Sequence, residues 1–175
     1  MEYAERNEAK RAAYQEGIEQ IPLNKRYYVD ETGINKFLYR ERGRAPRGVK
    51  VPGKISGKRF QRLSVVAAKC EDEIVERHEY ACNMNSRLFE FWFMLLLLVI
   101  ASGSVIIMDN ASFHRKKILK RMAEEAGCRV VFLPPYSPDF NPIEKVWANL
   151  KKFLRNHLAK FQSVSDAIYH YFEFA

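Results

Sequence analysis

The chain has 175 residues, of which 47% are apolar, so one domain with a buried core is expected and an intrinsically disordered protein is excluded. The net charge of +8 is local, because nine basic side chains and one acid lie between Arg40 and Arg62, leaving 20 basic and 20 acidic residues elsewhere. Such a positive segment on a neutral body indicates a polyanionic partner.

In the first half of the chain, residues 1–20 are charged and predict a helical arm before the domain. A strand over residues 26–31 is predicted to end at Thr32–Gly33. The basic segment is rich in Gly and Pro, which favours a long loop or loose hairpin. Strands over residues 63–68 and 73–80 can form an antiparallel meander with the first strand.

In the second half, a helix over residues 85–100 is predicted to be capped by Asn85 or Ser86. The apolar residues 105–108 predict a central strand, and Ser112 is a candidate cap for the helix that follows. The remaining expected elements are a helix over 115–126, a strand over 130–133, and helices over 142–157 and 165–172.

Three strands followed by alternating helices and strands predict an α/β fold, with a mixed five-stranded sheet between helices. We expect one catalytic domain over residues 21–175, after the arm over residues 1–20.

The N-terminus, the cysteines and the longest apolar run indicate a cytoplasmic protein without membrane contact. The N-terminus does not have the shape of a signal peptide. The three cysteines have no metal-type spacing and are typical of free thiols in a reducing compartment. The apolar run over residues 91–101 is shorter than the roughly 20 residues that cross a bilayer.

Three carboxylates lie at the ends of predicted elements: Asp30 and Asp109 close apolar strands, and Glu144 opens a helix. If the first and fourth strands are neighbours, the three acids converge, and they cannot all stay ionised without a cation. Oxygen ligands favour Mg²⁺ or Mn²⁺. Two such ions would stabilise the attacking and leaving oxygens in a displacement at phosphorus.

Each acid also has a local interpretation. Asp30 suits a plain turn, and Asp109–Asn110 suits an Asx turn. Asn141 and Glu144 are spaced as a capping box at a helix start. Local turn chemistry does not account for the segregated positive charge, which favours the shared site.

Three ordered motifs resemble the signature blocks of bacterial insertion-sequence transposases of the mariner superfamily. They are Val-Asp-Glu-Thr-Gly at 29–33, Met-Asp-Asn-Ala-Ser-Phe-His at 108–114, and Leu-Pro-Pro-Tyr-Ser-Pro-Asp-Phe-Asn-Pro-Ile-Glu at 133–144. The 34 residues between Asp109 and Glu144 match that branch. Residues 43–48 also resemble the family, and the likeness covers roughly residues 22–160.

The resemblance implies a ribonuclease-H-like fold and a DDE transposase in which Asp30, Asp109 and Glu144 are catalytic and hold two Mg²⁺ or Mn²⁺ ions. Asp30 and Asp109 would share the ions, and Glu144 would complete the second site. The reaction it implies is cleavage at a transposon end, followed by attack of the freed 3′-hydroxyl on target DNA at a TA step.

Four neighbouring residues are expected to support the site or the core. Asn110 and His114 would support the second aspartate or contact a phosphate. For His114, packing at the start of the helix is the favoured alternative. Asn141 is expected to cap the helix and so to fix the direction of Glu144, and Trp147 is expected in the core.

The basic segment is predicted to contact DNA phosphates, with a solvated loop as the alternative. The residues expected in this contact are Arg40, Arg42, Arg44, Arg47, Lys50, Lys54, Lys58, Arg59 and Arg62.

Members of the family carry N-terminal helix-turn-helix modules, for which the arm over residues 1–20 is too short. A split reading frame, a truncated copy, or the catalytic half of a fusion would each account for this, with a separate helix-turn-helix partner in the first case. The resemblance also implies a homodimer acting in the nucleoid. A catalytically silent DNA-binding fragment and a ribonuclease-H-like nuclease are the competing functions.

Overall fold

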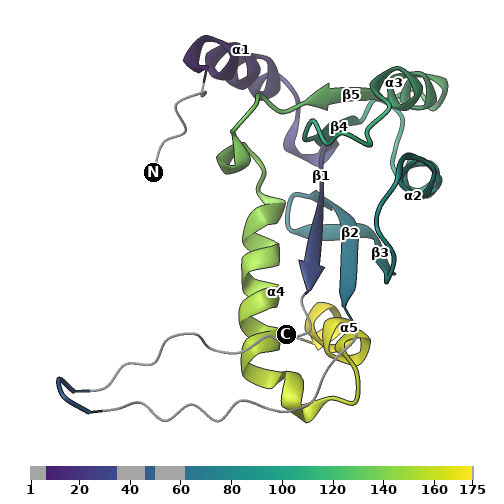
Figure 1. Ribbon diagram of the computed structural model, residues 1–175. Helices are drawn as coiled ribbons and strands as arrows, with labels where there is room; N and C mark the ends of the chain where they lie inside the picture. Colours follow the sequence, from purple (N-terminus) through teal and green to yellow (C-terminus); the bar gives the residue numbers. More distant parts are fainter. Residues whose placement is uncertain (1–6, 35–45, 50–61, 175) are drawn as a thin grey trace.

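A computed structural model describes residues 7–34, 46–49 and 62–174 of the chain (Figure 1). Its strands are β1 Arg26–Ile34, β2 Leu63–Cys70, β3 Glu73–Tyr80, β4 Val105–Met108 and β5 Arg129–Phe132. Its α-helices are α1 Glu8–Glu19, α2 Ser86–Val99, α3 Lys116–Glu125, α4 Ile143–His157 and α5 Val164–Phe174. Three short 3₁₀ turns also occur in the described residues: η1 Leu23–Lys25, η2 Pro138–Phe140 and η3 Leu158–Lys160.

The five strands form one mixed sheet in the order β3-β2-β1-β4-β5. The first three strands pair antiparallel as the predicted meander, whereas β4 lies parallel to both β1 and β5. All four residues of β4 are buried, as expected for a parallel strand covered on both faces. The predicted α/β architecture is therefore confirmed.

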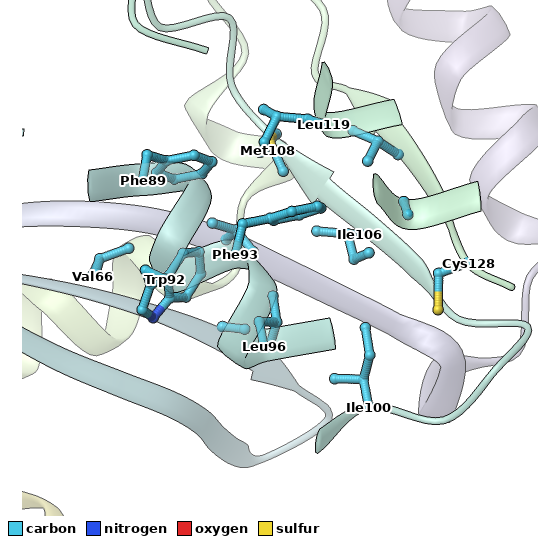
Figure 2. Close-up of a cluster of buried hydrophobic side chains, with 14 residues drawn as sticks. Val66, Phe89, Trp92, Phe93, Leu96, Ile100, Ile106, Met108, Leu119 and Cys128 are labelled. Carbon is cyan, nitrogen blue, oxygen red and sulfur yellow. The ribbon is translucent and has the colours of Figure 1, made fainter. Parts of the chain in front are cut away.

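Helices cover both faces of the sheet (Figure 1). On one face, α2 and α3 pack on β1, β2 and β4 around Phe89, Trp92 and Phe93, as Figure 2 shows. On the opposite face, α4 and α5 cover the antiparallel strands, and α1 packs against β4 and the segment after β5. The arm expected over residues 1–20 thus contains a helix, α1, that packs onto the sheet.

Two local expectations were wrong. Gly33 does not end β1, because Gly33 and Ile34 continue the antiparallel ladder with Ser64 and Leu63. Ser112 does not cap α3, which begins at Lys116 without a side-chain cap. A turn closed by the bond from the His114 backbone N–H to the Ala111 carbonyl comes first, and it moves the helix start along the chain.

The helix α2 has an unusual outer face. Asn85 caps it as predicted, by accepting bonds from the backbone N–H groups of residues 87 and 88. Its buried face packs on the sheet, but Phe91, Met94, Leu98 and Val99 are between 42% and 75% exposed. Among the described residues, no helix combines the length and the apolar character that a membrane span requires.

Candidate active site

Asp30 lies in the middle of β1 and faces α4. Its Oδ2 atom accepts a hydrogen bond from the indole N–H of Trp147, with 3.1 Å between the heavy atoms. Trp147 is 2% exposed and belongs to the core on this face of the sheet. The expectation that Trp147 is a core residue is confirmed, and the ring also orients one of the predicted catalytic acids.

Asp109 directly follows β4, the parallel neighbour of β1. Because Tyr28 pairs with Ile107, the register brings Asp30 and Asp109 to the same level two residues further on. The Asp109 Oδ1 atom accepts a bond from the Ala111 backbone N–H at 3.1 Å. The expected Asx turn is therefore present, and it fixes the carboxylate at the end of the strand.

Glu144 is an exposed residue in the first turn of α4. The predicted capping box is absent, because α4 begins at Ile143 with Pro142 at the cap position and no side-chain cap. Asn141 is 5% exposed, and its amide N–H₂ group instead donates to the Val29 carbonyl at 3.4 Å. Asn141 thereby ties the start of α4 to β1, next to Asp30.

The three acids line one cavity of about 310 Å³, together with Asn110, Asn141 and the proline-rich turn over residues 133–138. In the part of the chain that the structure describes, no group of three His, Cys, Asp or Glu side chains is arranged to hold a metal ion. The fold therefore brings the predicted triad to one pocket, without closing it into a finished coordination shell.

The electrostatics of this pocket favour a cation. The pKa of Asp30 is raised to about 7: burial is the largest cause, the charges of Glu144 and Asp109 add to it, and hydrogen bonds from the Glu31 backbone N–H and from Trp147 act in the opposite direction. Three carboxylates around one cavity offer only oxygen donors, which is the chemistry that Mg²⁺ and Mn²⁺ prefer. The donor set therefore fits the divalent metal that the sequence predicted.

The next strand residue, Glu31, is a second acid with a shifted pKa, and its side chain lies on the opposite face of the sheet. Its pKa is raised to about 7, chiefly by burial and also by the charge of Asp109, while a hydrogen bond from the Tyr80 hydroxyl at 2.9 Å acts in the opposite direction. Its Oε1 atom is buried and has no hydrogen-bond partner among the described residues. Glu31 is not among the site residues predicted from the sequence, because its hydrogen-bond partner Tyr80 is 49 positions away and no local pattern reveals the contact.

His114 and Asn110 both lie in the segment between β4 and α3. The His114 Nδ1 atom lies 3.1 Å from the Asp109 carbonyl oxygen and 3.4 Å from its Oδ1 atom, and burial lowers the pKa of the ring. Its ring also packs on Phe89, with 4.3 Å between the centroids. Asn110 donates to the Leu133 carbonyl at 2.8 Å and accepts from the Lys116 Nζ atom at 2.5 Å. Both residues therefore connect Asp109 to its surroundings.

An ion pair between the buried Arg11 and the half-exposed Asp139, which sequence reasoning missed, holds η2 after the proline-rich turn. Arg11 in α1 donates two hydrogen bonds to Asp139, of 3.0 and 2.5 Å, and its guanidinium lies 4.0 Å from the centroid of the Phe140 ring. The Tyr14 ring stacks on Phe140 at 5.2 Å. Because Arg11 and Asp139 are 128 positions apart, no local pattern could have revealed their contact.

Tyr136 has a strained backbone in the wall of the same cavity. Its φ angle of 56° lies in the left-handed region, which a bulky residue rarely adopts outside sites where the surroundings enforce it. The ring is 49% exposed and lines the pocket beside the carboxylates. The strain marks this turn as a shaped part of the site.

Two of the predicted DNA-contacting residues, Arg47 and Arg62, are described, and both are exposed. The other seven lie outside the described residues: Arg40, Arg42, Arg44, Lys50, Lys54, Lys58 and Arg59.

Part of the chain is similar to a curated protein. An uncharacterized protein of Sinorhizobium fredii, y4pE/y4sA, is 31% identical over 68 residues, which are 38% of this chain and 47% of that protein. The chain thus spans about half the length of the curated relative that it matches.

Three similar solved structures have the same fold. The Mos1 transposase paired-end complex with the left transposon end has a TM-score of 0.75 at 16% identity over the whole chain and 58% of that protein. The catalytic domain of Mos1 mariner transposase has a TM-score of 0.65 at 14% identity over the whole chain and 85% of that domain. The catalytic core of BIV integrase has a TM-score of 0.50 at 10% identity over 83% of this chain and 79% of that core.

These likenesses confirm the ribonuclease-H-like fold shared by transposase and integrase catalytic cores. The family described as DDE superfamily endonuclease matches residues 25–168, a range that includes the whole sheet and all three acids of the pocket. The chain therefore belongs to the DDE superfamily endonucleases.

Proposed function

We propose that this chain is the catalytic domain of a DNA transposase that cuts a DNA strand at a transposon end and joins the freed 3′-hydroxyl to target DNA. The observation that carries the proposal is the meeting of Asp30, Asp109 and Glu144 at one cavity, from β1, β4 and α4. Family membership supports the same chemistry.

In this proposal Asp30, Asp109 and Glu144 would hold two Mg²⁺ or Mn²⁺ ions. Such ions, when bound, neutralise phosphate charge and stabilise the attacking and leaving oxygens of a phosphoryl transfer. Two structures of similar fold are Mos1 mariner paired-end complexes with Mn and with Mg, which supports the choice of metal.

The protein's own part is to position the acids. Trp147 holds one oxygen of Asp30, and the Ala111 N–H holds one oxygen of Asp109. Asn141 fixes the start of α4, and so the place of Glu144, against β1. Asn110 and His114 would keep the segment after β4 in place while the DNA strand lies across it.

The wider setting belongs to the same proposal. DNA ends and a TA-containing target are the proposed substrates, and a homodimer and a helix-turn-helix partner are the proposed assembly. The catalytic domain would cover residues 21–175, the basic segment would contact DNA, and the protein would work in the bacterial cytoplasm at the nucleoid.

A DNA cleavage assay with Mg²⁺ or Mn²⁺ tests the proposal, with plasmid DNA and duplexes carrying candidate element ends as substrates. Asp109→Asn and Glu144→Gln should abolish metal-dependent nicking and joining. Glu125→Gln is the matched control, because Glu125 is an exposed acid that pairs with Arg121 on α3, away from the cavity. Cleavage that survives Asp109→Asn in a pure preparation contradicts the assignment.

A catalytically silent fragment that binds DNA is the second candidate. Such a fragment would use exposed basic residues, of which Arg47 and Arg62 are described, to bind DNA without turnover at the acids. In the same assay it predicts DNA binding without cleavage at any metal concentration, with or without an added helix-turn-helix partner. An RNA–DNA hybrid as a further substrate distinguishes a ribonuclease-H-like nuclease.

A further inference from the structure

A second cavity, of about 550 Å³, adjoins the active-site pocket. The two cavities share four wall residues, Asn110, Leu133, Pro134 and Pro135. The other walls are Lys10 and Tyr14 from α1, Lys116 from α3 and Phe132 from β5. The volume falls within the range of sites that take a small ligand or a part of a larger one.

The two cavities have opposite charge. Three acids line the first, whereas the described residues that line the second include two lysines and no acid. Lys116 stands at the boundary, where its Nζ atom bonds to Asn110 and lies 5.0 Å from the centroid of the Phe132 ring. A polyanion that enters the acidic pocket would therefore find its compensating charge directly beside it.

The outer wall of the second cavity is held firmly. The Arg11–Asp139 pair and the Tyr14–Phe140 stack fasten α1 to η2, which directly follows the proline-rich turn of the active site. The Tyr14 hydroxyl is buried and has no hydrogen-bond partner among the described residues. Aromatic and proline surfaces with two lysines at the rim suit a nucleotide, which has a phosphate, a sugar and a flat base.

We propose that this second cavity binds the DNA strand next to the phosphate that reacts at the acids. Lys10 and Lys116 contact its phosphate groups, and Tyr14 and Phe132 pack against sugar and base. The inference rests on the proposed function, and it makes α1, which lies before the residues matched by the family, part of the substrate site.

Binding of a fluorescent mixed-sequence duplex tests this inference, because phosphate contacts do not depend on sequence. All variants carry Asp109→Asn, so that no strand is cut. The test variant is Lys10→Ala with Lys116→Gln, since glutamine can still donate to Asn110. The matched control is Lys117→Ala with Lys120→Ala, which removes the same charge from exposed positions of α3 that line neither cavity.

Each lost lysine–phosphate contact lowers the slope of log affinity against log salt by about 0.9, so the test variant should lose about two units of slope and bind about tenfold more weakly. The control should keep the parental slope. Lys10→Arg with Lys116→Arg keeps both positive charges and should therefore also show the parental slope. Unchanged slope in the test variant overturns the inference, and so does an equal loss in the control.

The two proposals fail in distinguishable ways. A lysine-dependent slope in a chain that never cleaves DNA overturns the proposed catalysis and leaves the strand site standing. Cleavage by the parental chain, together with an unchanged slope in the test variant, overturns the strand site alone.

Discussion

At the scale of single residues, the bond between Trp147 and Asp30 combines core packing with site chemistry. Trp147→Phe keeps most of the buried ring but removes the N–H that orients the carboxylate. Loss of such a supporting bond should reduce DNA cleavage about tenfold or more and require more metal for half-maximal rate. Cleavage kinetics over a metal titration measure both effects.

Trp92→Phe is the control for this prediction, because the Trp92 N–H donates to the Glu76 carbonyl on the other face of the sheet. It removes the same group from an equally buried ring, at a distance from the acids. Equal losses of cleavage in the two variants would show that only general packing matters at Trp147.

The raised pKa of Asp30 predicts a pH-dependent stability. Its pKa is about 7 in the folded protein against an ordinary value of 3.8, so the folded state holds a proton that the unfolded chain releases in this window. Without metal, the free energy of unfolding should therefore fall as pH rises from about 4 to about 7, and stay low above it.

Asp30→Asn removes this penalty. With a chelator present, the variant should be more stable than the parent at about pH 8, by on the order of 1 kcal/mol or more, and nearly equal to it at about pH 4. Urea unfolding at both pH values measures the difference. Glu31 titrates in both proteins and cancels in the comparison, so a difference that does not vary with pH contradicts the assignment to Asp30.

At the scale of elements, α1 is expected to stabilise the turn that leads to Glu144. Arg11→Ala should lower the urea midpoint and the cleavage rate together, because it leaves Asp139 without its two-pronged partner. Arg11→Lys should recover only part, since an ammonium cannot reproduce both hydrogen bonds.

A double-mutant cycle with Asp139→Ala isolates the pair: the double variant should be little worse than either single one. Arg121→Ala, which breaks an exposed pair 3.7 Å long on α3, should change neither quantity. Additive losses in the cycle would mean that the two side chains act separately.

Sequence reasoning succeeded where a local pattern decides the structure. The apolar residues of β4 predicted a strand buried on both faces, and the helical stripe of α4 predicted its buried side. Both aspartates could be placed because each ends or interrupts such a pattern. Asn85 was recognised as a cap because the helix after it begins without an intervening turn.

It failed where a distant contact outweighs a local preference. Asn141 has the spacing of a cap, but its amide bonds to the Val29 carbonyl, 112 positions away. Gly33 suggested the end of a strand, but pairing with β2 carries β1 onward. Arg11 looked like one charge among many on a polar arm, although its partner, Asp139, holds it buried.

At the scale of the whole molecule, the metal should act as a folding ligand. Ions that bind only the folded state add about 2.7 kcal/mol when their free concentration is about 100 times the dissociation constant. Mg²⁺ or Mn²⁺ should therefore raise the melting temperature in thermal unfolding. Asp109→Asn should remove most of the shift and Glu125→Gln none, whereas an equal shift in both variants would indicate general ion effects.

The apolar outer face of α2 should respond to added salt in the opposite way to the lysines that bind nucleic acid. Added salt weakens the attraction between lysines and a nucleic acid, while strongly hydrated salts increase the adhesion of exposed Phe91, Met94 and Leu98 to other apolar surfaces. The purified chain should therefore bind polyanions at low ionic strength and precipitate in concentrated sulfate. Leu98 is the most exposed of these side chains, and Leu98→Lys should widen the range of salt concentration over which the protein stays monodisperse.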